Sequence, residues 1–287
     1  KRQAVKALRA EGYEISSSTN KGYHLDAVPN SISAQELAAY LDEARMQTVE
    51  CLASVDSTNN RLRELALAGA PNGQVVLANE QTQGKGRRGR AFASPQDNGI
   101  YLSILFHPDT LPTDIVEITA WTAVATNNAI EEVCGVRAGI KWVNDLVIDR
   151  KKICGILTEM SVESESGYIQ YLIIGIGINV NGQAEDFPAE IRSTATSLAM
   201  GTGKTHSRAA LAAALIRAWP KEKTEYLEAY RRDNITTGKE ITVVRGTEEA
   251  PAFAVAIGDD FSLRVRYADG RSEALSSGEI SIKGLYH

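Results

Sequence analysis

Residues 140–160 read Ile-Lys-Trp-Val-Asn-Asp-Leu-Val-Ile-Asp-Arg-Lys-Lys-Ile-Cys-Gly-Ile-Leu-Thr-Glu-Met, two apolar stretches around a charged turn. Ile140 to Ile148 and Lys152 to Met160 each have the length and the β-branched content of a strand. The turn Asp149-Arg150-Lys151 is too short to hold a crossover helix, so the two strands are expected to form an antiparallel hairpin. This hairpin favours an α+β domain with a mixed or antiparallel sheet over a βαβ array.

The segments around this hairpin fit such a domain, which we expect to cover residues 29–235. Pro29 and Asn30 form a linker, and Ser33 with Glu36 has the spacing of a helix capping box. Helical periodicity is present over two further stretches, with Pro220 interrupting the second. The expected strands are residues 74–79, 99–106 and 168–179, and the expected helices are residues 115–133 and 208–231.

The first 28 residues look like a small separate unit. A helix over Ala4 to Ala10 is stopped by Gly12, and short strands follow at residues 13–16 and 22–25. Over residues 1–24 the local net charge is +3, from Lys1, Arg2, Lys6, Arg9 and Lys21 against Glu11 and Glu14. The pattern fits the second half of a winged helix-turn-helix and, equally well, a basic arm with no role on DNA. The chain begins without methionine and inside a helix, so we expect the natural N-terminus to lie further upstream.

The last 50 residues change character and read as all-β. Four short strands are expected at residues 241–245, 252–257, 263–267 and 279–282, and Asp269-Gly270 has the sequence of a hairpin turn. We therefore expect a small barrel-like domain over residues 236–287.

Length and composition limit the class of protein. A chain of 287 residues is expected to form two or three domains, and no apolar run or leader suggests a membrane span or a signal peptide. The three scattered cysteines suggest neither a zinc site nor disulfides, which fits a reducing cytoplasm. The net charge of −5 argues against coating nucleic acid by bulk charge.

The strongest local motif is the loop Gly84-Lys85-Gly86-Arg87-Arg88-Gly89-Arg90. It holds four cations among three glycines, and no acid occurs from Gln81 through Gln96. Glycine lets backbone N–H groups approach an anion, and arginine and lysine add charge-assisted bonds. The loop therefore predicts a segment that wraps an anionic ligand, although an empty loop of this kind can also be disordered.

Two apparent nucleotide motifs are rejected. The loop matches GxGxxG, but a strand and not a helix is expected after it. Gly201-Thr202-Gly203-Lys204-Thr205 resembles the end of a phosphate-binding loop, but Leu198 stands where the first glycine is required.

Four shorter motifs follow. Taken alone, each is better explained by a structural role, such as a helix cap or a satisfied ion pair, than by a functional one. They are Asp56-Ser57-Thr58-Asn59, Lys141-Trp142-Val143-Asn144-Asp145 on a strand, Lys152 with Gly155-Ile156, and Gly175-Ile176-Gly177-Ile178-Asn179. Alternation puts Lys141 and Val143 on one strand face and Trp142 and Asn144 on the other. The alternate glycines of the last motif let a ligand lie against the backbone.

Taken together and in this order, the motifs resemble the biotin protein ligases of the bifunctional ligase/repressor type, from about residue 4 to the C-terminus. Lys85 stands where the family usually has arginine, and Val143 where it often has proline. The resemblance implies a class II synthetase-like catalytic domain at residues 29–235. It also implies an incomplete winged helix-turn-helix at residues 1–28 and an SH3-like barrel at residues 236–287.

The resemblance also implies the reaction. Biotin and ATP form biotinyl-5'-AMP, with Mg²⁺ bridging phosphate oxygens, and the biotinyl group then passes to a lysine of a biotin carboxyl carrier protein. A full-length form is expected to be a homodimer that also binds operator DNA. Two alternatives stay open: a lipoate–protein ligase, and a DNA-binding repressor that senses biotin without transferring it.

Residue roles follow from the motif match. Ser57, Thr58 and Gln81, with Asn59 beside them, are expected at the ureido ring of biotin, and Lys152 at its carboxylate and the α-phosphate. Gly155 and Gly175 should flank the ligand, Phe92 should cover the adenine, and Ile178 and Asn179 should face the nucleotide. The expected catalytic set is Lys152, Arg87, Lys141 and Asp145, with Asp145 orienting the incoming lysine. The triphosphate and its Mg²⁺ are assigned to Lys141, Asn144 and Arg90, and the covering loop to Gly84, Lys85, Gly86, Arg87, Arg88, Gly89 and Arg90.

Overall fold

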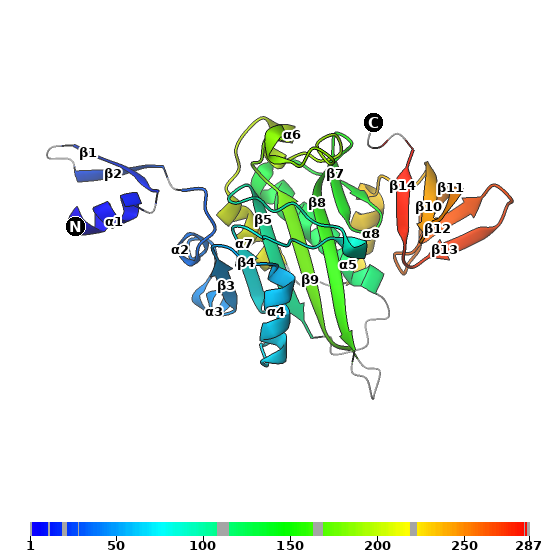
Figure 1. Ribbon diagram of the computed structural model, residues 1–287, viewed down its shortest axis with the longest axis horizontal. Helices are drawn as coiled ribbons and strands as arrows, with labels where there is room; N and C mark the ends of the chain where they lie inside the picture. The colour runs from blue at the N-terminus through cyan, green and yellow to red at the C-terminus, as the bar shows by residue number, and fades with distance from the viewer. Residues whose placement is uncertain are drawn as a thin grey trace. The chain divides into compact units, whose positions relative to one another are not determined.

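The computed structural model describes residues 2–10, 12–18, 22–27, 29–107, 115–162, 169–218, 223–283 and 285. The chain divides into two compact units, residues 1–31 and residues 32–287 (Figure 1). Each unit is described by itself. The expected boundary near residue 235, inside the second unit, stays a prediction.

The first unit is one helix followed by one hairpin. The helix α1 (Arg2–Ala10) precedes β1 (Glu14–Ser18) and β2 (Gly22–Ala27), which pair antiparallel. The guanidinium of Arg9 ties the helix to the hairpin, because its Nε donates to the carbonyl of Ile15 at 3.0 Å. The expected helix and two strands are confirmed, whereas their assignment to a winged helix-turn-helix stays a prediction.

The second unit contains a mixed sheet of seven strands in the order β3-β4-β5-β9-β8-β7-β6. The strands β3 and β4 are parallel, and every other neighbouring pair is antiparallel. This confirms the α+β class with a central mixed sheet. The strands are β3 (Val49–Leu52), β4 (Val75–Ala78), β5 (Gly99–Phe106), β6 (Gly139–Lys141), β7 (Asp145–Ile148), β8 (Lys151–Val162) and β9 (Ile169–Asn179).

The prediction of a single strand over residues 140–148 is wrong. β6 and β7 form a hairpin of their own, and Lys141 pairs with Asp145 across it. Trp142 and Val143 lie in the turn between the two strands, and both are buried. The turn is held from outside the sheet, since the Trp142 amide donates to Thr236 Oγ1 at 2.9 Å and its indole donates to the Phe261 carbonyl at 3.0 Å.

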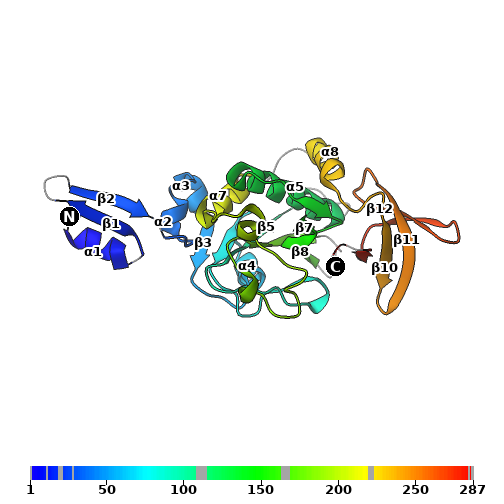
Figure 2. The same cartoon turned by 90° about the horizontal axis from the view of Figure 1, so that it is seen from above.

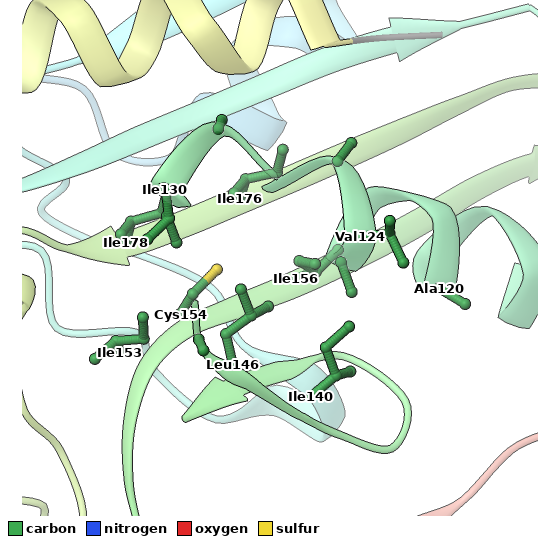
Figure 3. Close-up of a cluster of buried hydrophobic side chains, with 14 of the residues drawn as sticks. Ala120, Val124, Ile130, Ile140, Leu146, Ile153, Cys154, Ile156, Ile176 and Ile178 are labelled. Atoms are coloured by element: carbon green, nitrogen blue, oxygen red, sulfur yellow. The ribbon is translucent and has the colours of Figure 1, made fainter. Parts of the chain in front are cut away.

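Helices cover both faces of this sheet (Figure 2). The long helix α5 (Ile115–Cys134) packs against one face together with α7 (Arg208–Ala218), and Figure 3 shows its side chains meeting those of β6 to β9. On the opposite face, α4 (Thr58–Leu67) buries Leu62 against a smaller cluster. No helix in the described part of the chain is long and apolar enough to cross a membrane. The remaining helices are α2 (Ala34–Leu37), α3 (Glu43–Met46), α6 (Leu198–Thr202) and α8 (Lys223–Asp233).

A buried arginine joins α7 to the loop that precedes β5. Arg208 is fully buried, and its guanidinium donates to the Gly99 carbonyl at 2.8 Å, to Asn79 Oδ1 at 2.9 Å and to Asp97 Oδ1 at 3.1 Å. A buried guanidinium with several acceptors holds them at fixed separations. The two ends of the basic loop, after β4 and before β5, are therefore anchored to the core.

The end of the chain is a five-stranded antiparallel sheet in the order β13-β12-β11-β10-β14. Its strands are β10 (Glu240–Arg245), β11 (Glu248–Ile257), β12 (Leu263–Tyr267), β13 (Ser272–Leu275) and β14 (Glu279–Ile282). The expected Asp269-Gly270 turn joins β12 to β13. The strand β13 was not predicted. Leu275 is its one buried residue, so its sequence lacks the alternation of apolar and polar residues that indicates a strand. The SH3-like classification of this sheet stays a prediction.

Candidate functional site

The predicted motifs converge on two adjoining cavities of the second unit. The first has a cavity volume of about 50 Å³ and the second of about 420 Å³, and both are lined by Arg87, Phe92, Asn144 and Lys152. The second lies within the usual size range of a small-molecule pocket. The walls come from the start of α4, the loop between β4 and β5, the β6–β7 turn, parts of β8 and β9, the segment at residues 187–195 and the strand β14.

Most predicted site residues line one of these cavities. The first is lined by Ser57, Thr58, Asn59, Gln81, Lys85, Gly86, Arg87, Phe92, Asn144, Lys152, Gly155 and Gly175. The second adds Arg88, Arg90, Lys141, Asp145 and Asn179. Gly84, Gly89 and Ile178 line neither cavity. Ile178 lies in the hydrophobic core (Figure 3), and the carbonyl of Gly84 accepts a bond from the Phe92 amide at 2.8 Å, which closes the loop.

One wall of the first cavity is a chain of polar side chains. Thr58 donates to Gln81 Oε1 from its amide at 2.8 Å and from its hydroxyl at 3.0 Å, and Gln81 Nε2 donates to Ser94 Oγ at 2.9 Å. Behind them, Ser103 Oγ lies 2.7 Å from Thr58 Oγ1 and 2.5 Å from Asn59 Oδ1. Buried polar groups linked in this way have few alternative orientations.

Sequence reasoning missed Ser103 and Ser94 in this wall, and Glu159 beside it. Glu159 accepts from Asn59 Nδ2 at 2.7 Å and from Arg63 Nη2 at 2.9 Å. A signal for Ser103 was present, since it is the one hydroxyl-bearing side chain inside the apolar interior of β5 apart from Tyr101. A buried serine in such a strand needs a polar partner.

The glycines of β8 and β9 make room for side chains of the protein. A methyl group on Gly175 would overlap the Asn59 amide, and one on Gly177 would overlap the ring of Phe92. The expectation that the alternate glycines of β9 serve direct contact between ligand and backbone is therefore incomplete. Their first effect is to seat Asn59 and Phe92, both of which line the first cavity.

The basic loop is ordered by contacts outside the central sheet. Arg87 Nη1 donates to Asn144 Oδ1 and its Nη2 to the Gly278 carbonyl, both at 2.9 Å. Arg88 and Arg90 reach Glu279 of β14 at 3.4 and 2.8 Å. A single 3-10 turn over Arg87–Gly89 lies within the motif, and no α-helix stands between it and β5, as the rejection of the dinucleotide motif requires. The second glycine-lysine motif is also only a helix end, with Gly203 at a φ of 73°.

Positive charge dominates where the cavities meet. Lys152 Nζ lies 2.7 Å from Asp145 Oδ1, so one carboxylate faces several cations. Burial lowers the pKa of Lys141, against the opposing effect of Asp145, and burial likewise lowers the pKa of Arg87. Cations with this loss of hydration are stabilised by an anionic ligand. The arrangement can therefore bind and neutralise phosphate or carboxylate groups.

The second cavity also offers apolar walls. Phe92 meets Tyr101 edge to face, with 6.4 Å between ring centroids, and this fixes the plane of the Phe92 ring. Phe187, Ile191 and Ala195 supply further apolar surface. Such a wall suits a flat, weakly polar ring beside the cationic region.

The described residues contain no group of three or more His, Cys, Asp or Glu side chains that could hold a metal ion. Asp145 and Glu279 are the carboxylates that line the second cavity. Mg²⁺ is commonly held by one or two carboxylates together with substrate phosphates. The donor set therefore fits a metal that arrives with a phosphate ligand and not a dedicated cage.

Comparisons with known proteins agree with this geometry. Residues 51–179 match the model of the biotin/lipoate A/B protein ligase family. The chain is 38% identical over 224 residues to the bifunctional ligase/repressor BirA of Bacillus spizizenii, covering 78% of this chain and 68% of that protein. It is 28% identical over 248 residues to the biotin–[acetyl-CoA-carboxylase] ligase of Mycobacterium tuberculosis, covering 81% and 88%.

A solved structure shows a similar arrangement. The biotin protein ligase from Aquifex aeolicus, in complex with biotin and ATP, superposes with a TM-score of 0.70 at 27% identity. The superposition covers 82% of this chain and 98% of that one.

Proposed function

The chain belongs to the biotin protein ligase family, and from this we propose which of its residues carry out the attachment of biotin to a protein. The observation that carries the proposal is that two adjoining cavities, which share Arg87 and Lys152, combine a polar wall, a cluster of cations and an apolar wall. These match, in order, the ring of biotin, the phosphates of ATP and the adenine. The solved Aquifex relative holds both ligands.

We propose that biotin occupies the first cavity. Its ureido ring meets Ser57, Thr58 and Gln81, and its carboxylate points to Lys152, because these groups line one continuous cavity. Gly155 and Gly175 line the same space. The adenylate part of the intermediate then lies in the second cavity, with Phe92 and Asn179 at the base and Lys141 and Arg90 at the phosphates.

The proposed chemistry needs no nucleophilic side chain. A biotin carboxylate oxygen attacks the α-phosphorus of ATP, the bond to the bridging oxygen breaks, and pyrophosphate leaves. The acceptor amine then attacks the carbonyl carbon of biotinyl-5'-AMP, AMP leaves, and the amine loses a proton. Lys152, Lys141 and Arg87 neutralise the charge that grows on the phosphates, which is the main demand of the first step. Mg²⁺ would add charge neutralisation at the phosphate oxygens. Asp145 and Asn144 carry the oxygen atoms that would hold it.

We propose that the acceptor is a lysine of a biotin carboxyl carrier domain. The Mycobacterium relative is named for acetyl-CoA carboxylase, which supports this class of partner. Asp145 lies beside Lys152 at the junction of the cavities and is the carboxylate best placed to orient the incoming ammonium group.

The test separates biotin from lipoate, since the matched family model includes both kinds of ligase. Incubation with ATP, a carrier domain and labelled biotin should give a covalently labelled lysine, detected by mass spectrometry. Labelled lipoate should not be transferred, because its ring has no N–H groups for the polar wall. Transfer of lipoate alone would identify the chain as a lipoate ligase, and binding of biotin without transfer would leave only a sensor.

Lys152→Ala should slow formation of the adenylate on the order of 100-fold or more, because one electrostatic contact to the growing charge is lost in a closed site. Biotin affinity should fall less. Pyrophosphate release and calorimetry measure the two effects. Lys151→Ala, at the neighbouring position of β8, is the matched control and should stay close to the parent enzyme. Near-normal pyrophosphate release by the Lys152 variant would remove this residue from the catalytic set.

Arg87→Gly should release the activated intermediate. The Arg87 guanidinium bridges Asn144 and Gly278 over the site, so its loss opens the cover above the mixed anhydride. Biotinylation of bystander lysines should rise on the order of tenfold as water and amines gain access. Arg150→Gly, which changes an exposed turn arginine with a φ of 66°, serves as the control. A variant that loses activity without leaking would assign the loop to binding and not to containment.

A second role, as a biotin-responsive repressor, is also proposed. The Bacillus relative bears that name, and the helix and hairpin at residues 2–27 are compatible with a recognition helix and wing. The edge of the seven-stranded sheet at β6 is already paired with Asn234 of the same chain. Dimerisation through β3, the edge strand that lies opposite β6, would allow two half-sites to be read. Ligand-induced ordering of the loops would promote that contact.

The 287-residue chain should bind operator DNA weakly. Residues 1–24 have a local net charge of only +3, which allows few phosphate contacts. Gel shift on a two-half-site operator, with and without biotin plus ATP, should give dissociation constants of about micromolar or weaker, in the range of non-specific binding. Adenylate-dependent binding near 10 nM, about the strength of specific complexes, would contradict this expectation.

A further inference from the structure

We infer that Ser103 and Glu159 are positioning residues that make the first cavity select a ring bearing N–H groups. Neither needs to touch the ligand. They act through Thr58 and Asn59, whose hydrogen-bond directions they fix. The inference rests on the proposed placement of the biotin ring in this cavity.

Glu159 fixes the orientation of the Asn59 side-chain amide. Asn59 Nδ2 lies 2.7 Å from Glu159 Oε2, and a carboxylate can only accept, so the nitrogen must be on that side. The other oxygen of Glu159 accepts from Arg63 Nη2 at 2.9 Å, which holds the carboxylate in place. The Asn59 oxygen is therefore the atom that faces Ser103.

Ser103 in turn determines which hydrogen bonds Thr58 can donate and accept. A hydroxyl has one proton, and Asn59 Oδ1, at 2.5 Å, can only accept it. The lone pairs of Ser103 Oγ then face Thr58 Oγ1 at 2.7 Å. Thr58 can donate its proton to Ser103 or to Gln81 Oε1 at 3.0 Å, and both lie within the protein. The free lone pair of Thr58 is left as an acceptor for a ligand N–H.

Burial gives this arrangement its energetic weight. Thr58 and Asn59 are each 3% exposed and Ser103 is fully buried. A donor or acceptor among these three side chains that lacks a partner therefore cannot form a hydrogen bond to water instead. Asn59 cannot shift toward β9, because it already fills the space left by the missing side chain of Gly175. A ureido N–H satisfies the acceptor at Thr58, whereas a dithiolane ring leaves it unpaired, and sites built for hydrogen bonds reject such ligands strongly.

The experiment compares Ser103→Ala and Glu159→Gln with matched controls. Ser161→Ala removes a serine hydroxyl of β8 that bonds to Gln170 at an exposed position, and Glu64→Gln removes an exposed carboxylate paired with Arg61. Calorimetry measures the binding of biotin and of an analogue in which the thiophane ring and valerate chain are kept but the ureido ring is absent. KM for ATP and thermal unfolding are recorded for every variant.

Ser103→Ala should raise the dissociation constant of biotin on the order of tenfold or more, because the Thr58 hydroxyl and the Asn59 amide are then no longer held in one orientation. Glu159→Gln should raise it by a smaller factor, since the Gln amide can face Asn59 with either end. Affinity for the ureido-free analogue and KM for ATP should stay within about twofold in both variants and both controls. General damage to the fold would weaken both ligands alike.

Unchanged biotin affinity in a folded Ser103→Ala or Glu159→Gln variant would overturn the inference. So would an equal loss for biotin and the analogue. If Ser103→Ala does not fold, the biotin affinity of Glu159→Gln alone tests the inference. Failure of the parent enzyme to bind or transfer biotin would instead refute the proposed function, so the two failures are distinguishable.

Discussion

The site depends on the turn between β6 and β7, which is fixed by bonds that come from elsewhere in the chain. Trp142 is held by Thr236 and Phe261, and the carbonyl of Val143 accepts from the Tyr230 hydroxyl at 3.2 Å. These contacts place Lys141, Asn144 and Asp145 in the wall of the second cavity, and Asn144 also lines the first. Without them the apolar residues of this segment would be free to continue as one strand, and those three polar groups would not converge.

The same logic explains the neighbouring glycines. A ligand site on a flat sheet needs side chains that stand above the strands, and these must have space beneath them. Gly175 and Gly177 supply that space for Asn59 and Phe92. The cavity is thus shaped by side chains seated in the sheet, while its charge comes from the loop and from β8.

Local patterns predicted most of the secondary structure and most of the site. The hairpin at Asp149-Arg150, the strand at residues 99–106 and the long helix α5 follow from periodicity and turn chemistry. The β6–β7 turn could not be predicted, because its cause is bonding to residues about 90 or more positions away. Ser103 and Glu159 were missed for a related reason. Their partners lie on α4, which is distant in sequence, and become visible only when that helix is packed across the sheet.

The bond from Arg87 to Gly278 has a further consequence for how this enzyme can change over generations. The acceptor is a main-chain carbonyl, but Gly278 has a φ of 131°, a conformation that residues with a side chain rarely adopt. The next residue, Glu279, pairs with Arg88 and Arg90. Two adjacent positions of the C-terminal sheet, one needed for its backbone conformation and one for its carboxylate, are therefore the ones least free to change while the cover of the site is kept.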